Sequence, residues 1–229
     1  MAVLLRVDVD NPYGYSNLYL TVLNRLSNQW RRFPKIEAMG YLWHLRKFVD
    51  DINNRGVKAT FFFRWVTVPK NLDPFAHHEL AFHADETDTL EHFKREFSKV
   101  SVMCGRKLSG FSKHGSGIEK LASWHTTEYE PEKYLKWAAL EGLKYFSGNG
   151  ENPSEQMKFV DGVRFYPSAF WVDQEYRAKR FTVNWLADEC QNRDIVVLIH
   201  PFNWAVNHQV QGDWEKIVSK VDNFRLFSS

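Results

Sequence analysis

Several features that would assign the chain to a particular class of protein are scarce or missing. Its 229 residues include only two cysteines, Cys104 and Cys190, which have neither the spacing of a zinc or redox motif nor the number needed for a disulfide framework. No stretch approaches the length of a transmembrane helix, and the short apolar run at the N-terminus leads directly into acidic residues, unlike a signal peptide. We therefore expect a cytoplasmic protein without a membrane span.

An excess of one charge is also missing. The formal net charge is +2 and no block of like charges occurs, so neither a nucleic acid nor an anionic membrane surface is an expected partner. Aromatic side chains, by contrast, are abundant and make up 16% of the residues. We expect most of them to pack in the core and the remainder to line a binding cleft, because aromatic rings line many sugar and small-molecule sites.

Apolar strand-like runs alternate with amphipathic helical runs along the chain. Strands are expected at about 3–9, 57–63, 79–82, 107–111, 143–146, 163–165 and 194–199. Helices are expected at about 35–54, 87–103, 132–142, 174–191 and 213–222. Because parallel strands need crossover connections, the alternation predicts an α/β fold with a parallel sheet. About seven strand–helix pairs in a single domain, residues 1–229, favour a closed barrel over an open sheet.

Two carboxylates mark the end of the first predicted strand. Asp8 and Asp10 are two residues apart, so their side chains lie on the same face of the strand, side by side. Carboxylates this close repel each other unless a cation, a shared proton or a hydrogen-bond donor compensates. In a barrel the ends of the strands converge on one face, so further strand-end residues are expected nearby. These are Arg64, His83, His114 and His200.

A long insert, residues 13–34, follows the first strand. We expect it to lie over the same face of the barrel as a lid or cleft wall, and to be partly helical from about 17 to 30.

Four strand-end motifs, taken in order, match a known pattern. They are Asp-Val-Asp at 8–10, Lys-Ala-Thr-Phe-Phe at 58–62, His-Glu-Leu-Ala-Phe-His at 78–83 and Val-Leu-Ile-His-Pro at 197–201. Together they resemble the polysaccharide deacetylase family, carbohydrate esterase family four, over most of the chain. The resemblance implies a distorted (β/α)7 barrel and the removal of N-acetyl groups from amino sugars with a divalent metal, most often zinc.

The resemblance also implies roles for four residues. Asp8 would be the general base that deprotonates the attacking water, Asp10 and His83 would be metal ligands, and His200 would protonate the leaving amine. Amide hydrolysis needs an activated water, stabilisation of the developing oxyanion and protonation of a poor leaving group, and these residue types supply them.

The chain departs from the family pattern in its second motif. Thr87 stands where the family carries a second histidine, and two protein ligands make a poor zinc site. Three solutions are open at this point. Asp85 or Asp88 could ligate, His114 could reach in from the next strand end, or the site could work without a metal.

The third and fourth motifs also diverge. The usual Arg-x-Pro pattern is replaced by residues 110–115, in which Lys113 is a candidate for the charge role of the arginine. The fourth motif is only faintly echoed in residues 165–173. We regard Arg64, Lys113 and Trp204 as candidate substrate-binding residues, since Arg64 could bind an anionic group and Trp204 could form a sugar-facing wall.

Three hypotheses of function follow. The first is a hydrolase of carbon–nitrogen amide bonds that removes an N-acyl group from an amino sugar or a carrier-linked sugar with a divalent metal. The second is a metal-free amidohydrolase acting on a small nitrogenous compound, favoured by the missing histidine at Thr87. The third is a catalytically inactive barrel that binds a glycan or a partner, favoured by the divergent third and fourth motifs.

Overall fold

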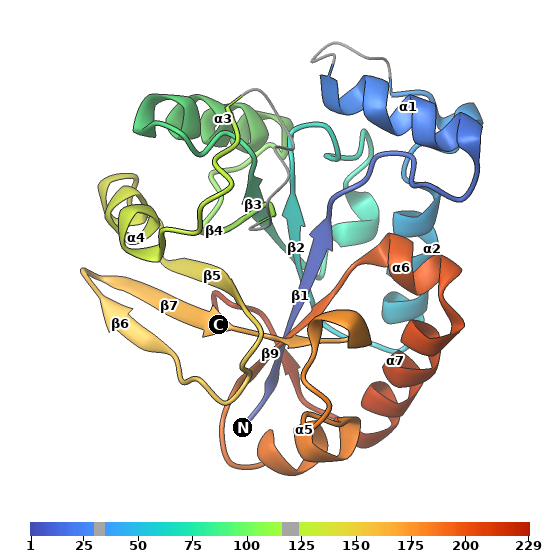
Figure 1. Cartoon of the computed structure of the whole chain (residues 1–229), viewed down its shortest axis with the longest axis vertical. Coiled ribbons are helices and arrows are strands. Elements are labelled where there is room, and N and C mark those ends of the chain that lie inside the picture. Colours follow the sequence, from blue (N-terminus) through green and yellow to red (C-terminus); the bar gives the residue numbers. More distant parts are fainter. Residues whose placement is uncertain (30–34, 116–123) are drawn as a thin grey trace.

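A fully buried strand, β1 (Val3–Val9), lies at the centre of the fold, which is a computed structural model describing residues 1–29, 35–115 and 124–229 (Figure 1). Its side chains alternate between two apolar environments. Val3, Leu5, Val7 and Val9 belong to the core between the sheet and the helices, whereas Leu4 belongs to a smaller cluster inside the barrel. By this alternation, Arg6 and Asp8 also face the barrel interior, so β1 carries an apolar base and a charged upper end.

The described residues form one ten-stranded sheet in the order β6-β7-β5-β4-β3-β2-β1-β9-β8, with β10 paired to β1. The remaining strands are β2 (Thr60–Phe63), β3 (Glu79–Ala84), β4 (Gly110–Lys113), β5 (Tyr145–Gly150), β6 (Lys158–Val160), β7 (Val163–Ser168), β8 (Phe170–Trp171), β9 (Ile195–Ile199) and β10 (Phe224–Arg225). Every pairing is parallel except that between β6 and β7, which is antiparallel.

One continuous stretch of chain closes the barrel. Only Ala169 separates β7 from β8, yet β7 pairs with β5 and β8 pairs with β9. The stretch therefore changes partner midway and links the two sides of the curled sheet. Seven strands, with β7 and β8 taken as one, thus form the distorted barrel predicted from the sequence, and the predicted α/β fold class is confirmed.

The helices cover the outside of the sheet (Figure 1). They are α1 (Leu18–Gln29), α2 (Trp43–Asn54), α3 (Leu90–Met103), α4 (Pro131–Leu140), α5 (Val183–Glu189), α6 (Pro201–Val206) and α7 (His208–Lys220). Short 3-10 turns occupy Glu37–Met39, Asp73–Phe75 and Gln174–Tyr176. None of the described helices is long and apolar enough to cross a bilayer.

Two predicted helices differ from the structure. The helix expected at 174–191 is wrong in its first half, because α5 begins only at Val183, where the side chain of Thr182 accepts a hydrogen bond from the backbone of Trp185. The helix expected from 35 starts at Trp43, since Gly40 with φ of 85° and Leu42 with φ of 53° interrupt the helical backbone. An additional short helix, α6, follows His200 directly.

The insert after β1 turns sharply at Gly14, where φ is 82° and a Cβ atom would lie 2.2 Å from the ring of Phe202. Only glycine fits this approach. Helix α1 then runs alongside the carboxyl end of the strands (Figure 1). The last part of the predicted insert, residues 30–34, lies outside the described residues.

Candidate active site

The carboxyl ends of the barrel strands surround a cleft of about 460 Å³. Its lining includes most of the polar strand-end residues that the sequence singles out: Asp8, Asp10, Arg64, His83, Lys113, His114 and His200. The insert contributes Tyr15 and Asn28, and Trp171 and Tyr176 come from the chain after β7. The cleft therefore combines a charged floor with aromatic walls.

Asp8 is held by an arginine of its own strand. The guanidinium of Arg6 donates from Nε to Asp8 Oδ1 at 2.8 Å and from Nη2 to Oδ2 at 2.6 Å, and both side chains are buried. The remaining donors of Arg6 reach across the barrel to β5, where they bond to Ser147, Gly148 and Asn149. Arg6 thus fixes the position of Asp8 and balances its charge.

Three ligand-type atoms converge beside Asp8. Oδ1 of Asp10 lies 2.9 Å from Nε2 of His83 and 3.2 Å from Nδ1 of His114. This oxygen is buried and makes no hydrogen bond of acceptable geometry in the described part of the chain. An orphaned carboxylate oxygen next to two imidazole nitrogens is the donor set of a catalytic zinc site with one carboxylate and two histidines. The residues present therefore fit a divalent metal.

Neighbouring side chains orient these groups. Nδ1 of His83 lies 2.6 Å from the hydroxyl of Ser112 on β4, which leaves Nε2 directed to Asp10. Arg64 donates to both oxygens of Asp85 and to the backbone carbonyl of Asp10. The orientation of the three-residue cluster is thus supported from two adjacent strands.

His200 lies beside the other carboxylate oxygen of Asp10, Oδ2. Its Nε2 lies 3.4 Å from Asp10 Oδ2, and its Nδ1 donates to Asp173 Oδ2 at 3.2 Å. Asn203, one turn along in α6, donates to the same oxygen at 3.0 Å. Asp173 therefore holds the imidazole from behind while Nε2 faces the cleft.

The carboxylates and His200 have pKa values shifted in opposite directions. Burial acts to raise the pKa of Asp8, but Arg6 and His83 outweigh it and hold the pKa below its ordinary value. Burial is likewise outweighed at Asp10, where His114 and His200 hold the pKa well below its ordinary value. For His200, the attraction of Asp10, Asp173 and Asp8 overcomes burial and raises the pKa to about 9. The cleft thus holds ionised carboxylates next to a protonated histidine, the combination needed for paired base and acid catalysis.

The pKa of His114 is shifted in the opposite direction from that of His200. Burial, reinforced by the charge of Arg64, lowers its pKa. A neutral imidazole is the form that binds a metal ion. The structure thus places His114, the residue directly after β4, beside Asp10 and His83, as one of the three solutions open from the sequence requires.

The remaining candidate residues lie elsewhere or have other partners. Both oxygens of Asp85 are taken up by Arg64. Asp88 lies outside the cleft lining and contacts Nδ1 of His92 at 2.8 Å. Thr87 accepts a hydrogen bond from the backbone of Thr126, away from Asp10.

Lys113 and Trp204 also differ from their expected surroundings. Nζ of Lys113 donates to the carbonyl of Gly115 and lies 3.3 Å from Nε2 of His125, whereas the cation paired with Asp8 is Arg6. Trp204 is not part of the cleft lining and packs on Phe48 of α2, with ring centroids 5.2 Å apart.

Sequence reasoning missed two residues of the site. Arg6 has a recognisable signal, because a charged side chain in an apolar strand, two residues before Asp8, must face the same side and find a counter-charge. Asp173 lies in the faint fourth motif, and its partner His200 is 27 residues away, so its role depends on contacts that only the fold creates.

No model of a protein family matches the chain, and no curated protein is similar to it. Solved structures are similar in fold. A provisionally assigned polysaccharide deacetylase from Mycobacterium smegmatis has a TM-score of 0.57 at 16% identity, covering 98% of this chain and 86% of that chain. One from Pseudomonas aeruginosa PAO1 has a TM-score of 0.55 at 10% identity, covering 97% and 86%. The chain therefore has the fold of the polysaccharide deacetylases, as its strand-end motifs predict.

Proposed function

We propose that the chain is a divergent polysaccharide deacetylase that hydrolyses an amide bond with the help of a divalent metal. The observation that carries this proposal is the convergence of Asp10, His83 and His114, with Asp10 Oδ1 buried and lying 2.9 Å and 3.2 Å from the two ring nitrogens. The set has one carboxylate and two histidines from three different strand ends. Zinc suits these ligands and is the metal that we propose.

The metal, when bound, would supply polarisation of the scissile carbonyl and activation of a water molecule. The residues of the chain supply the proton transfers. Asp8, ionised and fixed by Arg6, accepts a proton from the attacking water. His200, protonated and oriented by Asp173, donates a proton to the leaving amine. Ligand-type atoms of Asp8, Asp10 and His200 lie within 4.8 Å of one another, so the proposed base and acid would both reach the same substrate amide.

The aromatic walls support a sugar substrate. The ring of Trp171 lies 5.8 Å from that of His200 and 5.2 Å from that of Tyr176, and Tyr15 closes the cleft from the insert. Aromatic faces next to polar groups suit the alternating apolar and hydroxyl surfaces of a sugar ring. We therefore propose an N-acyl amino sugar or its conjugate as substrate, with the insert acting as a cleft wall. The two cysteines are free thiols, which fits the cytoplasmic location that we propose.

Metal content and turnover test the proposal together. Elemental mass spectrometry should find near-stoichiometric metal in the wild-type protein and little in His83→Ala. His77→Ala, a change at an exposed histidine outside the cleft, is the matched control and should retain the metal. Acetate release from a panel of N-acetylated sugars should be lost in Asp8→Asn.

Two results would favour the other functions. Turnover that survives complete chelation would point to a metal-free amidohydrolase, and would contradict the metal role given to Asp10, His83 and His114. Glycan binding without turnover, unchanged in Asp8→Asn and His200→Ala, would point to an inactive binding barrel.

A further inference from the structure

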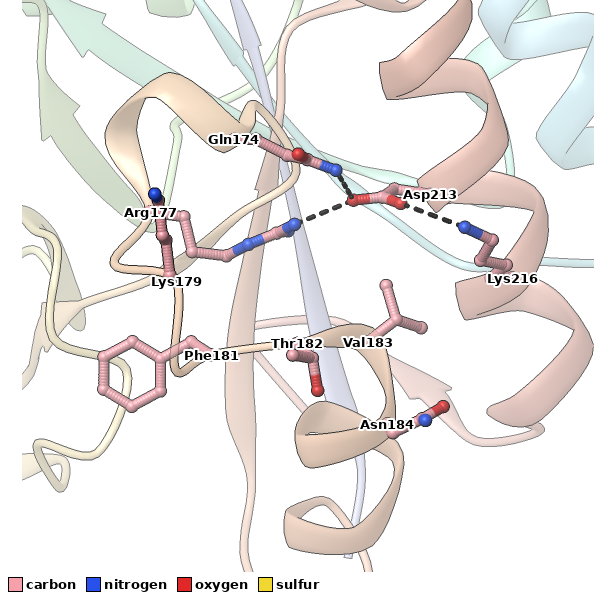
Figure 2. Close-up of a pocket in the computed structure, with 9 residues that line it drawn as sticks. All are labelled: Gln174, Arg177, Lys179, Phe181, Thr182, Val183, Asn184, Asp213 and Lys216. Carbon is pink, nitrogen blue, oxygen red and sulfur yellow. Dashed lines mark hydrogen bonds and ion pairs between the residues drawn. The ribbon is translucent and has the colours of Figure 1, made fainter.

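A second cavity, of about 530 Å³, lies outside the catalytic cleft between α7 and the chain that leads into α5 (Figure 2). Seven of its nine described lining residues are polar or charged, among them Gln174, Thr182 and Asn184. The reaction proposed above makes no use of it. Its charge is also unlike that of the chain as a whole, which is nearly balanced.

Positive charge predominates in this cavity, here named the basic cavity. Arg177, Lys179 and Lys216 line it, and Asp213 is the one carboxylate among its described lining residues. Asp213 Oδ2 accepts from Arg177 at 2.7 Å and from Gln174 at 2.8 Å, while Lys216 lies 3.6 Å from the other oxygen (Figure 2). Lys179 has no ion-pair partner in the part of the chain that the structure describes. The described lining thus carries three cations and one carboxylate, and the cavity has room for an added negative group.

The cationic lining is held in place by the fold. Arg177 is largely buried, donates to the backbone carbonyl of Trp171 at 2.8 Å, and lies 4.3 Å above the ring of Phe170. The two lysines, by contrast, are exposed at the cavity mouth. A fixed guanidinium in the same cavity as two adaptable ammonium groups suits a phosphate or carboxylate.

A smaller hollow of about 300 Å³ borders both the basic cavity and the catalytic cleft. The hollow shares Tyr176 and Asn203 with the cleft, and it shares Gln174 with the basic cavity. The three depressions therefore follow one another around the segment 173–177. A substrate longer than one sugar unit would pass from one to the next.

We propose that the basic cavity binds an anionic group of the same substrate whose amide is cleaved in the cleft. The substrate is then an N-acylated sugar chain or conjugate that carries a phosphate or carboxylate at a distance from the amide. This inference rests on the proposed deacetylase function for the identity of the substrate, but the presence of an anion site in the basic cavity does not depend on catalysis.

Binding of inorganic pyrophosphate at low ionic strength tests the site directly. Calorimetry should show that the double variant Lys179→Glu/Lys216→Glu binds at least about tenfold more weakly than the wild type, because two charges at the cavity mouth are reversed and the net charge there becomes more negative by about four units. The matched control is Lys158→Glu/Lys220→Glu, which makes the same change in charge at exposed lysines outside the cavity. Any binding at a metal in the cleft is common to all three proteins. Equal binding by the three would overturn the proposal.

Steady-state kinetics test the link to the substrate. The substrates are an N-acetylated oligosaccharide, the same oligosaccharide with a terminal phosphate, and one with a terminal uronate, which separate the two anionic groups. In the double variant we expect KM for either anionic substrate to rise about tenfold. We expect kcat, and the KM for the neutral substrate, to stay unchanged. Turnover of all three substrates with no effect of the variant would refute the binding of the substrate's anionic group in the basic cavity and leave the deacetylase function standing. If none is turned over, the proposed function fails and the pyrophosphate measurement alone decides the anion site.

Discussion

The catalytic cleft and the basic cavity lie on two sides of the same segment, residues 171–177, but they hold charge in different ways. In the cleft, Asp8 is paired with Arg6 and Asp85 with Arg64, and each of these four side chains is buried. In the basic cavity, a single buried pair, Arg177 and Asp213, supports two exposed lysines. The difference suits the two proposed roles, because charge fixed by the fold would serve chemistry at one point and adaptable charge would serve recognition.

The largest expected effect is the loss of a cleft carboxylate. Asp10→Asn should abolish metal binding and reduce turnover by at least about a thousandfold, because metal activation contributes several kcal/mol to transition-state stabilisation. Asp88→Asn is the matched control, since Asp88 lies outside the cleft and contacts His92. Metal content and initial rates check both. Equal metal content in the two variants would contradict the role given to Asp10.

A buried pair in the cleft can next be compared with the pair in the basic cavity. Arg6→Met leaves Asp8 buried without its cation, and we expect a loss of about 3–5 kcal/mol in the free energy of unfolding. Arg177→Met should lose less, because Asp213 keeps the hydrogen bond from Gln174 and the nearby charge of Lys216. Urea denaturation measures both changes. A larger loss for Arg177→Met would reverse the comparison.

A smaller effect is expected from the hydroxyl behind His83. Ser112→Ala removes the contact at 2.6 Å that orients the imidazole, and metal affinity should fall by roughly 10- to 100-fold. The melting temperature of Ser112→Ala, measured with metal in excess, should equal that of the wild type. Ser109→Ala, in the loop just before β4, is a control with the same chemical change outside the cleft lining. Competition with a chelator gives the affinities.

The smallest effect concerns the pH dependence of the basic cavity. Burial acts to raise the pKa of Asp213, but hydrogen bonds from Arg177 and Gln174 outweigh it and lower the pKa. Since the native pKa lies below the unfolded value of about 3.9, the carboxylate stabilises the fold above that pH and loses this contribution as the pH falls through the native pKa. Asp213→Asn should therefore be about 1–3 kcal/mol less stable than the wild type near neutral pH, with the difference shrinking below about pH 4. Urea midpoints measured across pH provide the test, and a constant difference would contradict it.

The sequence predicts the central strands and their polar ends well, for a physical reason. A parallel strand buried on both faces is a continuous apolar run, and 3–9 and 194–199 stand out as such runs that end in Asp8–Asp10 and His200. The local pattern is less informative where tertiary contacts decide. Residues 174–182 have a helical pattern, yet the bonds from Arg177 to Trp171 and Asp213 hold them against the barrel as a turn and an irregular segment.

The candidate site likewise has a part that the sequence predicts and a part that only tertiary contacts decide. Asp10, His83 and His114 could be named from their positions after strands, but which histidine replaces the one missing at Thr87 depends on the spacing of β3 and β4 in the sheet. The strand that closes the barrel depends even more on tertiary contacts. The stretch from β7 to β8 pairs with β5 and then with β9, and no local signal specifies a change of partner.

The pairing of β1 also bears on how the protein is synthesised. Of the described strands β1 is made first, yet Val3 pairs with Ile195 of β9 and with Phe224 of β10, the two described strands that are made last. Pairing over such sequence separations is slow, and the early strand must wait for its late neighbours. A nascent chain that has reached residue 190 already contains the three proposed metal ligands but neither β9 nor His200. The proton donor that we propose thus joins the site after the proposed metal ligands, and a chain that stops before β9 would lack the acid proposed for the leaving amine.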